Sequence, residues 1–327
     1  MLGSVRSLNA DQDQWQVVKV QSLVPPRTRA INVKVCGQSR VSSTAGGMAD
    51  DFSVSLHQLP NEIAGKQPIP CVITKHPMLR ETGQGTGRIT IIWETDSFLR
   101  PQFLDWGWEP GRTIFSQPIQ TTYIDDCHYV HKAEISYEGE KFNDPAVSER
   151  NIMFYRVRCG GEESELYRYI TPPPPFTYQS TETSSSRVAI VSDNQYGSQV
   201  MRHIAYDIQT FHPDLLLMAG DIVNRGYLLE EWGMYFWYPL EVSQLAQQTP
   251  VAITRGNHDG QSSFAFAYTA GIKNNDWFAF THGSARFVVL DSNADSEMVP
   301  EQKAWMKKEF QSKEFDEALF RFVAFSL

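Results

Sequence analysis

Three short polar segments, each placed directly after an apolar run, constrain this chain more than any other feature. Each run is short, rich in leucine or β-branched residues and bounded by Gly, Asp or Asn, which is typical of a buried strand. The pairs of apolar run and polar segment are 187–191 with 192–195, 214–219 with 220–226, and 251–254 with 256–259. Polar residues at the carboxyl ends of successive parallel strands gather in one crevice of an α/β sheet. The sequence therefore predicts that three distant segments meet at one site.

The polar segments carry carboxylate, amide, guanidinium and imidazole groups. The candidate site residues are Asp193, Gln195, Asp221, Asn224, Arg225, Asn257, His258 and Asp259. Carboxylate and amide oxygens are ligands for hard cations, so the pattern favours a metal site. Asp193 alone is also compatible with a helix cap, and Asn257 alone with a turn. The three other histidines near these segments fit surface or satisfied core positions better than ligand positions: His203, His212 and His282.

Helices are predicted between the strands. Residues 198–211 have one apolar stripe with spacings of four, four and three, which indicates an amphipathic helix: Val200, Ile204, Ile208 and Phe211. Residues 228–247 are predicted to form an aromatic-rich helix that Pro239 kinks or splits, with its aromatic rings in the core and at its rim. Further elements are a hairpin over 277–281 and 286–290, a helix over 300–310 and a last strand over 320–325.

The chain ahead of these elements has the alternating pattern of β structure. Residues 1–65 are predicted to be a small N-terminal β region with strands at 15–24, 30–35 and 52–59. Residues 66–171 are predicted to form a β-sandwich of immunoglobulin type. Residues 172–186 form a linker rich in Pro, Ser and Thr, and the α/β part occupies 187–327.

Charge and composition exclude some classes of protein. The formal net charge of the 327 residues is −9, which gives no footprint for a nucleic-acid backbone. No apolar run approaches the roughly 20 residues of a membrane-spanning helix. The start of the chain lacks the apolar core of a signal peptide, which leaves a cytoplasmic protein or one with an incomplete start. The spacing of Cys36, Cys71, Cys127 and Cys159 disfavours a zinc site and leaves buried thiols or two disulfides open.

The order Asp-x-Gln, Gly-Asp-x-x-Asn-Arg-Gly and Gly-Asn-His-Asp resembles the calcineurin-like metallophosphoesterases. The resemblance implies hydrolysis of a phosphomonoester or phosphodiester by hydroxide activated between two metal ions, Mn, Fe or Zn, without an organic cofactor. It also implies metal ligation by Asp193, Gln195, Asp221 as the bridge, and Asn257. His258 would then act on the leaving group.

The same resemblance implies supporting roles for three neighbours of these residues. Asp259 would orient the ring of His258, and Arg225 with Asn224 would bind the phosphate. Asn224 stands where purple acid phosphatases carry a metal-binding tyrosine, so their tyrosinate–iron site is not expected. Gln195 stands where many relatives carry histidine.

Residues 66–171 resemble a fibronectin type III domain, the module found ahead of the catalytic domain in purple acid phosphatases. The family also supplies histidine ligands from a His-ended strand and a later Gly-His-x-His, and the chain contains no Gly-His-x-His. The expectation is therefore a C-terminally truncated enzyme of impaired activity, with an uncovered sheet face that aggregates unless a partner protein covers it.

These inferences combine into one expected architecture. It is a β-sandwich N-terminal region plus an α/β part, a partial four-layer α/β/β/α metallophosphoesterase domain acting on a phosphate ester. Two alternatives remain open: a non-catalytic remnant, and a β-sandwich binding protein whose α/β part is a scaffold. Metal content separates them, with about two ions per chain for the enzyme and fewer than one for a remnant.

Overall fold

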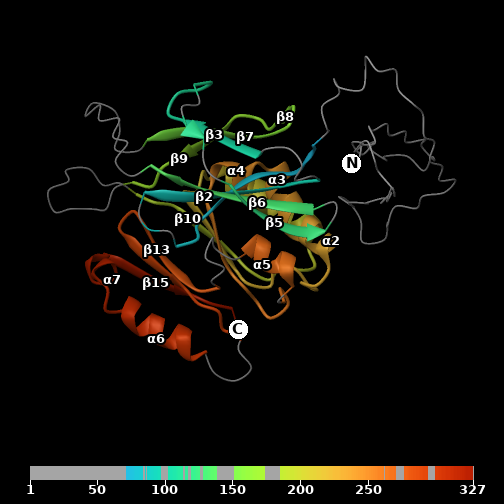
Figure 1. The fold of residues 1–327 in the computed structure, drawn as a ribbon. Coiled ribbons are helices and arrows are strands. Elements are labelled where there is room, and N and C mark those ends of the chain that lie inside the picture. Colours follow the sequence, from blue (N-terminus) through green and yellow to red (C-terminus); the bar gives the residue numbers. More distant parts are fainter. Residues whose placement is uncertain are drawn as a thin grey trace, which may run out of the picture.

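The computed structural model describes most of the chain after residue 70 (Figure 1). The described residues are 71–83, 85, 87–96, 102–112, 115–116, 119–125, 128–137, 151–173, 185–260, 262–269, 276–293 and 299–326. The predicted N-terminal β region, 1–65, lies outside them, as do Cys36 and Cys127.

Within the described residues, nine strands precede the proline-rich segment and belong to two sheets. The bounds are β1 Ile73–Arg80, β2 Arg88–Thr95, β3 Gln102–Gly107, β4 Phe115–Ser116, β5 Gln120–Asp125, β6 His128–Ser136, β7 Ile152–Cys159, β8 Glu162–Glu163 and β9 Tyr167–Ile170. Strands β1, β2, β6 and β5 are neighbours in one sheet, and β4, β3, β7 and β8 in the other, with β9 paired to β7. A shared apolar core joins the sheets through side chains such as Trp93, Trp106 and Tyr155. The fibronectin type III resemblance of this region stays a prediction.

A disulfide between Cys71 and Cys159 closes the loop that contains most of these strands. The two cysteines are 88 positions apart, and both are buried in the same core. Of the two possibilities that the cysteine spacing left open, Cys71 and Cys159 therefore form a disulfide and are not free thiols.

The three strands predicted ahead of the polar segments are confirmed. They are β10 Val188–Val191, β11 Leu215–Ala219 and β12 Val251–Thr254. They pair in parallel, with Val191 opposite Met218 and Met218 opposite Ile253. Their carboxyl ends therefore lie at one edge of the sheet, as the sequence required for a common site.

This parallel sheet continues into the strands that precede the proline-rich segment. The strand order is β10-β11-β12-β1-β2-β6-β5, and β1 pairs with β12 at Arg80 and Val251. The Arg80 guanidinium bonds the carbonyls of Val251 and Thr269 at 3.0 and 2.9 Å. The sheet is thus continuous across the two regions, while the predicted domain bounds stay a prediction.

A buried ionic cluster also joins the two regions. The Glu94 carboxylate on β2 accepts hydrogen bonds from Thr74 Oγ1 at 2.9 Å, from Lys75 Nζ, and from Tyr268 Oη at 2.5 Å. His128 Nδ1 lies 2.9 Å from the same carboxylate. Burial alone would raise the pKa of Glu94, but the charges and hydrogen bonds of Lys75 and His128 lower it to about 2. The carboxylate is therefore ionised and fully partnered inside the protein.

Helices cover one face of the parallel strands. Their bounds are α1 Ser198–Thr210, α2 Leu229–Glu231, the π-helix η1 Trp232–Trp237, α3 Tyr238–Val242, α4 Leu245–Gln248 and α5 Ser263–Thr269. The helix predicted over 228–247, which Pro239 was expected to kink or split, is therefore several pieces. Pro239 lies in the first turn of α3, directly after the π-helix, and Gln244 interrupts the run with a left-handed φ of 55°. Proline lacks the N–H of a regular helical bond, which accounts for the irregularity at its position.

The aromatic side chains of this region lie in the core or at its rim, as expected, and Tyr235 and Tyr238 are half-buried. Trp232, Phe236 and Trp237 are buried and pack together with Tyr268 of α5.

Helix α1 buries a different face from the one that its apolar stripe suggested. Its buried residues are Met201 and Ala205. Val200 is 61% exposed and Phe211, the residue after the helix, is 67% exposed. The spacing of the apolar residues correctly identified side chains that share one face of the helix. Within the described part of the chain, that face is largely exposed to solvent.

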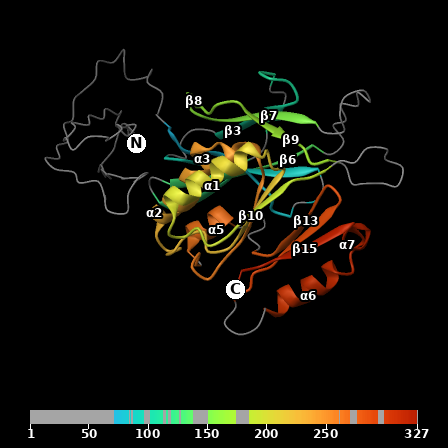
Figure 2. The same cartoon turned by 180° about the vertical axis from the view of Figure 1, so that it is seen from behind.

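A second sheet packs against the other face of the parallel strands. It contains β13 Phe278–His282, β14 Ala285–Val289 and β15 Phe320–Ala324, which confirms the hairpin and the last strand. Helices α6 Pro300–Glu309 and α7 Lys313–Glu317 lie beyond it. Figure 2 shows α1 on one side of β10 and this sheet, followed by α6, on the other. One core lies between the two sheets and another beneath the outer helices, which gives the order α/β/β/α.

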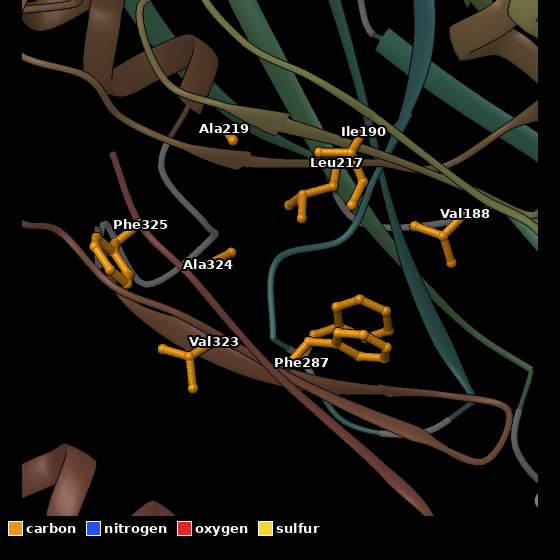
Figure 3. Close-up of a pocket in the computed structure, with 9 residues that line it drawn as sticks. Val188, Ile190, Leu217, Ala219, Phe287, Val323, Ala324 and Phe325 are labelled. Atoms are coloured by element: carbon orange, nitrogen blue, oxygen red, sulfur yellow. The ribbon is translucent and has the colours of Figure 1, made fainter. Parts of the chain in front are cut away.

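An apolar groove of about 270 Å³ opens between the two sheets (Figure 3). Its lining comes from β10 and β11 on one side and from β14 and β15 on the other, with Ile190 and Phe322 64% and 46% exposed. Both β10 and β15 are terminal strands of their sheets, so the groove lies between two strand edges. None of the predicted site residues lines it.

Candidate functional site

The polar segments after β10 and β11 are in direct contact. The backbone N–H of Asp193 donates to the carbonyl of Gly220 at 3.2 Å. Asp193 and Asp221 both have left-handed backbones, with φ of 53° and 49°. Such angles are uncommon for residues other than glycine, and they cluster at functional sites. The two carboxylates are thus placed by sharp turns at the ends of neighbouring strands.

The segment after β12 packs against the segment after β11 without space for a side chain between them. A Cβ on Gly256 would lie 2.1 Å from Asp221 Oδ1 and 2.2 Å from the Asp221 backbone nitrogen. The N–H of His258 donates to Asp221 Oδ1 at 3.0 Å. The carboxylate predicted to bridge two metals is therefore held by the loop that carries Asn257 and His258.

Gly226 makes the matching close approach on the other side of the loop. A Cβ there would lie 1.6 Å from the carbonyl oxygen of Asp259, and the Gly226 N–H donates to the carbonyl of His258 at 2.9 Å. The glycines before Asn257 and after Arg225 thus let the two loops lie backbone to backbone.

The His258 ring is oriented by a backbone group. Its Nδ1 lies 2.9 Å from the carbonyl oxygen of Asn224. A carbonyl only accepts hydrogen bonds, so Nδ1 carries the proton and Nε2 is the nitrogen left for chemistry.

The orienting role predicted for Asp259 is wrong, because both of its carboxylate oxygens bond backbone N–H groups. Oδ1 accepts from Ile222 and Val223 at 2.8 and 3.0 Å, and Oδ2 accepts from Gly256 at 2.7 Å. Burial raises the pKa of Asp259 to about 6, although these three bonds act in the opposite direction. Asp259 therefore fastens the loops after β11 and β12 together.

Arg225, predicted to bind phosphate, is paired with an acidic residue. Its Nε donates to Glu231 Oε1 at 2.6 Å, and its side chain is still 53% exposed. Hydrogen bonding and the negative charge of Glu231 raise the pKa of Arg225 above its ordinary value. The guanidinium is accordingly a fixed cation at the surface of the site.

The donor set around the loops is an oxygen set. Asp193 and Asn257 are exposed, Asp221 is buried, and Gln195 is half-buried. Gln195 Oε1 is buried and, within the described residues, lacks a hydrogen-bond donor, which suits contact with a cation. Among the residues that the structure describes, no three His, Cys, Asp or Glu side chains come together as a metal site. The set therefore fits a hard, oxygen-preferring ion held by two carboxylates and two amides.

Two supporting residues were not found by sequence reasoning. Glu231 holds Arg225, and the buried Arg255 contacts Asp276 and Asp291 at 2.8 and 3.2 Å, which anchors the start of the loop carrying His258. The sequence gives a single indication of this role, which is that Arg255 stands immediately before Gly256.

Comparison with known proteins finds a family that is similar to the part of the chain that carries the site. Residues 186–321 match the family model for calcineurin-like phosphoesterases. The match begins just before β10 and ends within β15, so it covers all three loops of the site.

Two of the similar proteins are named purple acid phosphatases, and a third is named PhoD. Purple acid phosphatase 18 of Arabidopsis thaliana is 22% identical over 258 residues, which cover 74% of this chain and 54% of the relative. The structure of purple acid phosphatase PPD1 from yellow lupin (Lupinus luteus) seeds has a TM-score of 0.61 at 16% identity and covers 77% of this chain and 51% of that one. The structure of PhoD has a TM-score of 0.52 at 14% identity, with coverage of 76% and 61%. The chain thus spans about half the length of the purple acid phosphatases that it matches.

These similarities support a metallophosphoesterase α/β fold, which agrees with the layers described above. Within the described helices, none is long and apolar enough to cross a membrane.

Proposed function

We propose that this chain is a metal-dependent phosphoesterase that hydrolyses phosphomonoester or phosphodiester bonds. The observation that carries the proposal is the contact of the three loops at the carboxyl edge of β10, β11 and β12, where Gly256 lies directly against Asp221. Asp193, Gln195, Asp221 and Asn257 would hold the metal. Of the expected ions Mn, Fe and Zn, this oxygen donor set favours Mn or Fe. Bound metal would neutralise the ester and lower the pKa of a water molecule.

The remaining residues of the site have roles that follow from their contacts. Nδ1 of His258 is held by the Asn224 carbonyl, so Nε2 is available to protonate or stabilise the oxygen of the leaving group. Asp221 would contribute through the oxygen that does not bond the His258 N–H. Arg225 supplies a positive charge for the phosphoryl oxygens.

The relatives named purple acid phosphatase support phosphoester hydrolysis as the reaction class. They also suggest a more specific domain organisation. In this organisation, residues 66–171 are a fibronectin-like module ahead of a phosphoesterase domain that begins at residue 187. The Asn224 side chain replaces the tyrosine of purple acid phosphatases, so the protein would lack their tyrosinate–iron absorption.

The absence of three clustered His, Cys, Asp or Glu side chains in the described residues favours one alternative, a non-catalytic protein that binds a single ion weakly. Hydrolysis separates the two functions.

The test is turnover of 4-nitrophenyl phosphate and bis(4-nitrophenyl) phosphate with added manganese. His258→Ala should lower turnover by roughly 10² to 10⁴ while manganese stays bound. The loss should be smaller for substrates with better leaving groups, because these need less protonation. The control is His203→Ala, which removes an exposed histidine on α1. Equal turnover in the two variants, or no hydrolysis by the wild type, would refute the proposal.

A further inference from the structure

Glu231 has an unusual position for an acidic residue beside a site that would bind an anion. It is the last residue of α2, and its side chain is only 4% exposed. Both carboxylate oxygens bond the same residue: Oε2 accepts the Arg225 backbone N–H at 2.7 Å, and Oε1 accepts Arg225 Nε–H at 2.6 Å. A buried carboxylate is thus satisfied by a single arginine six positions earlier.

The pairing leaves one edge of the guanidinium free. Glu231 occupies Nε, and no acceptor in the described part of the chain bonds Nη1 or Nη2 of Arg225. A guanidinium is planar and rigid, so fixing Nε also fixes the plane in which the two Nη groups lie. Two parallel N–H groups on one edge match two oxygens of a phosphoryl group.

The backbone under Arg225 is fixed as well. The Gly226 carbonyl accepts hydrogen bonds from Trp232 Nε1 at 3.0 Å and from Ser262 Oγ at 2.8 Å. The Leu228 N–H closes a turn onto the Arg225 carbonyl at 2.8 Å. With backbone and Nε both held, Arg225 has little rotamer freedom to lose on binding a ligand.

An ordinary surface ion pair explains these contacts less well. Such pairs join two exposed side chains and contribute little. Here the Glu231 carboxylate is buried and the Arg225 side chain is half exposed. The carboxylate therefore contacts the arginine and not solvent, whereas the guanidinium remains accessible to a ligand from solvent.

We propose that Glu231 is a positioning residue, which presets Arg225 so that Nη1 and Nη2 bind two non-bridging oxygens of a phosphoryl group. The inference rests on the proposed function, in which Arg225 contacts phosphate. It adds that the affinity for phosphate depends on a buried carboxylate that itself has the wrong charge to bind it.

The test is a double-mutant cycle read by calorimetric titration of inorganic phosphate into the full chain with manganese. Glu231→Gln keeps an oxygen for the Arg225 N–H but loses the charge that holds Nε. It should weaken phosphate binding about tenfold, or about 1.4 kcal/mol. Arg225→Ala should weaken binding at least as much. The double variant should match Arg225→Ala, because Glu231 acts through Arg225. Glu230→Gln removes the same charge from the exposed neighbour and should bind as the wild type does.

Arg225→Lys provides a second variant if Glu231→Gln does not fold. Lysine keeps the charge but lacks Nε and the fork, so it should lose affinity as alanine does. Wild-type affinity in Glu231→Gln or in Arg225→Lys would overturn the inference, as would losses that add in the double variant. If the wild type binds manganese but not phosphate, the inference about Glu231 is wrong, while the metal site stands. If the wild type binds neither manganese nor phosphate, the proposed function is wrong as well.

Discussion

Gly256→Ala should damage the site far more than an alanine substitution damages an ordinary turn. The new Cβ would lie 2.2 Å from the Asp221 nitrogen, whereas ordinary contact begins at 3.4 Å, so one loop must move by about 1.2 Å. The movement would push Asp221 Oδ1 away from the His258 N–H, a bond of 3.0 Å. Overpacking costs about 1–3 kcal/mol, and a broken bond to a buried carboxylate costs about 1–3 kcal/mol more.

Thermal unfolding and manganese titration would measure the two consequences. The melting temperature should fall by about 2–4 °C per kcal/mol, and the affinity for manganese should fall at least about tenfold. Gly161→Ala is the matched control, because nothing lies within 4 Å of the Cβ it would add. If Gly256→Ala and Gly161→Ala unfold and bind manganese alike, the loops after β11 and β12 are not packed as described.

Two further predictions concern the parts of the fold that hold the site. Glu94→Gln should destabilise the protein by about 3–5 kcal/mol, because it leaves Lys75 buried without its counter-charge. Denaturant unfolding would measure the loss of stability, and a loss below about 1 kcal/mol would contradict the prediction. The pKa of Glu94 is depressed from 4.5 to about 2, so its contribution is present above pH 4.5 and is lost as the pH falls toward 2, and Glu94→Gln should remove that part of the acid sensitivity. Replacing Cys71 and Cys159 together by serine should cost about 4 kcal/mol, since the disulfide closes a loop of 88 positions; equal unfolding midpoints for both forms would contradict this.

The strands and their common edge could be predicted because the information is local. Runs such as Val251–Thr254 are apolar, short and bounded by turn residues, and the alternation with helices required parallel pairing. The same order placed Asp193 and Asp221 at neighbouring strand ends, which the hydrogen bond from Asp193 to Gly220 confirms.

The roles of neighbouring side chains could not be predicted in the same way. His258 and Asp259 are adjacent in sequence and suggested a pair, but the turn directs their side chains to different partners. The contact between Arg225 and Glu231 depends on where α2 begins, which no periodicity marks. For α1 the stripe of Val200 and Phe211 showed which residues share a face, not whether anything covers it.

Metal content of the purified protein tests the central claim most directly. Wild-type protein dialysed against manganese should retain the metal in elemental analysis, whereas Asp221→Asn should lose it because the proposed bridging ligand loses its charge. Asp207→Asn removes an exposed carboxylate from α1 and should retain the wild-type content. Equal manganese in Asp221→Asn and Asp207→Asn would contradict a metal site at the carboxyl edge of β10, β11 and β12.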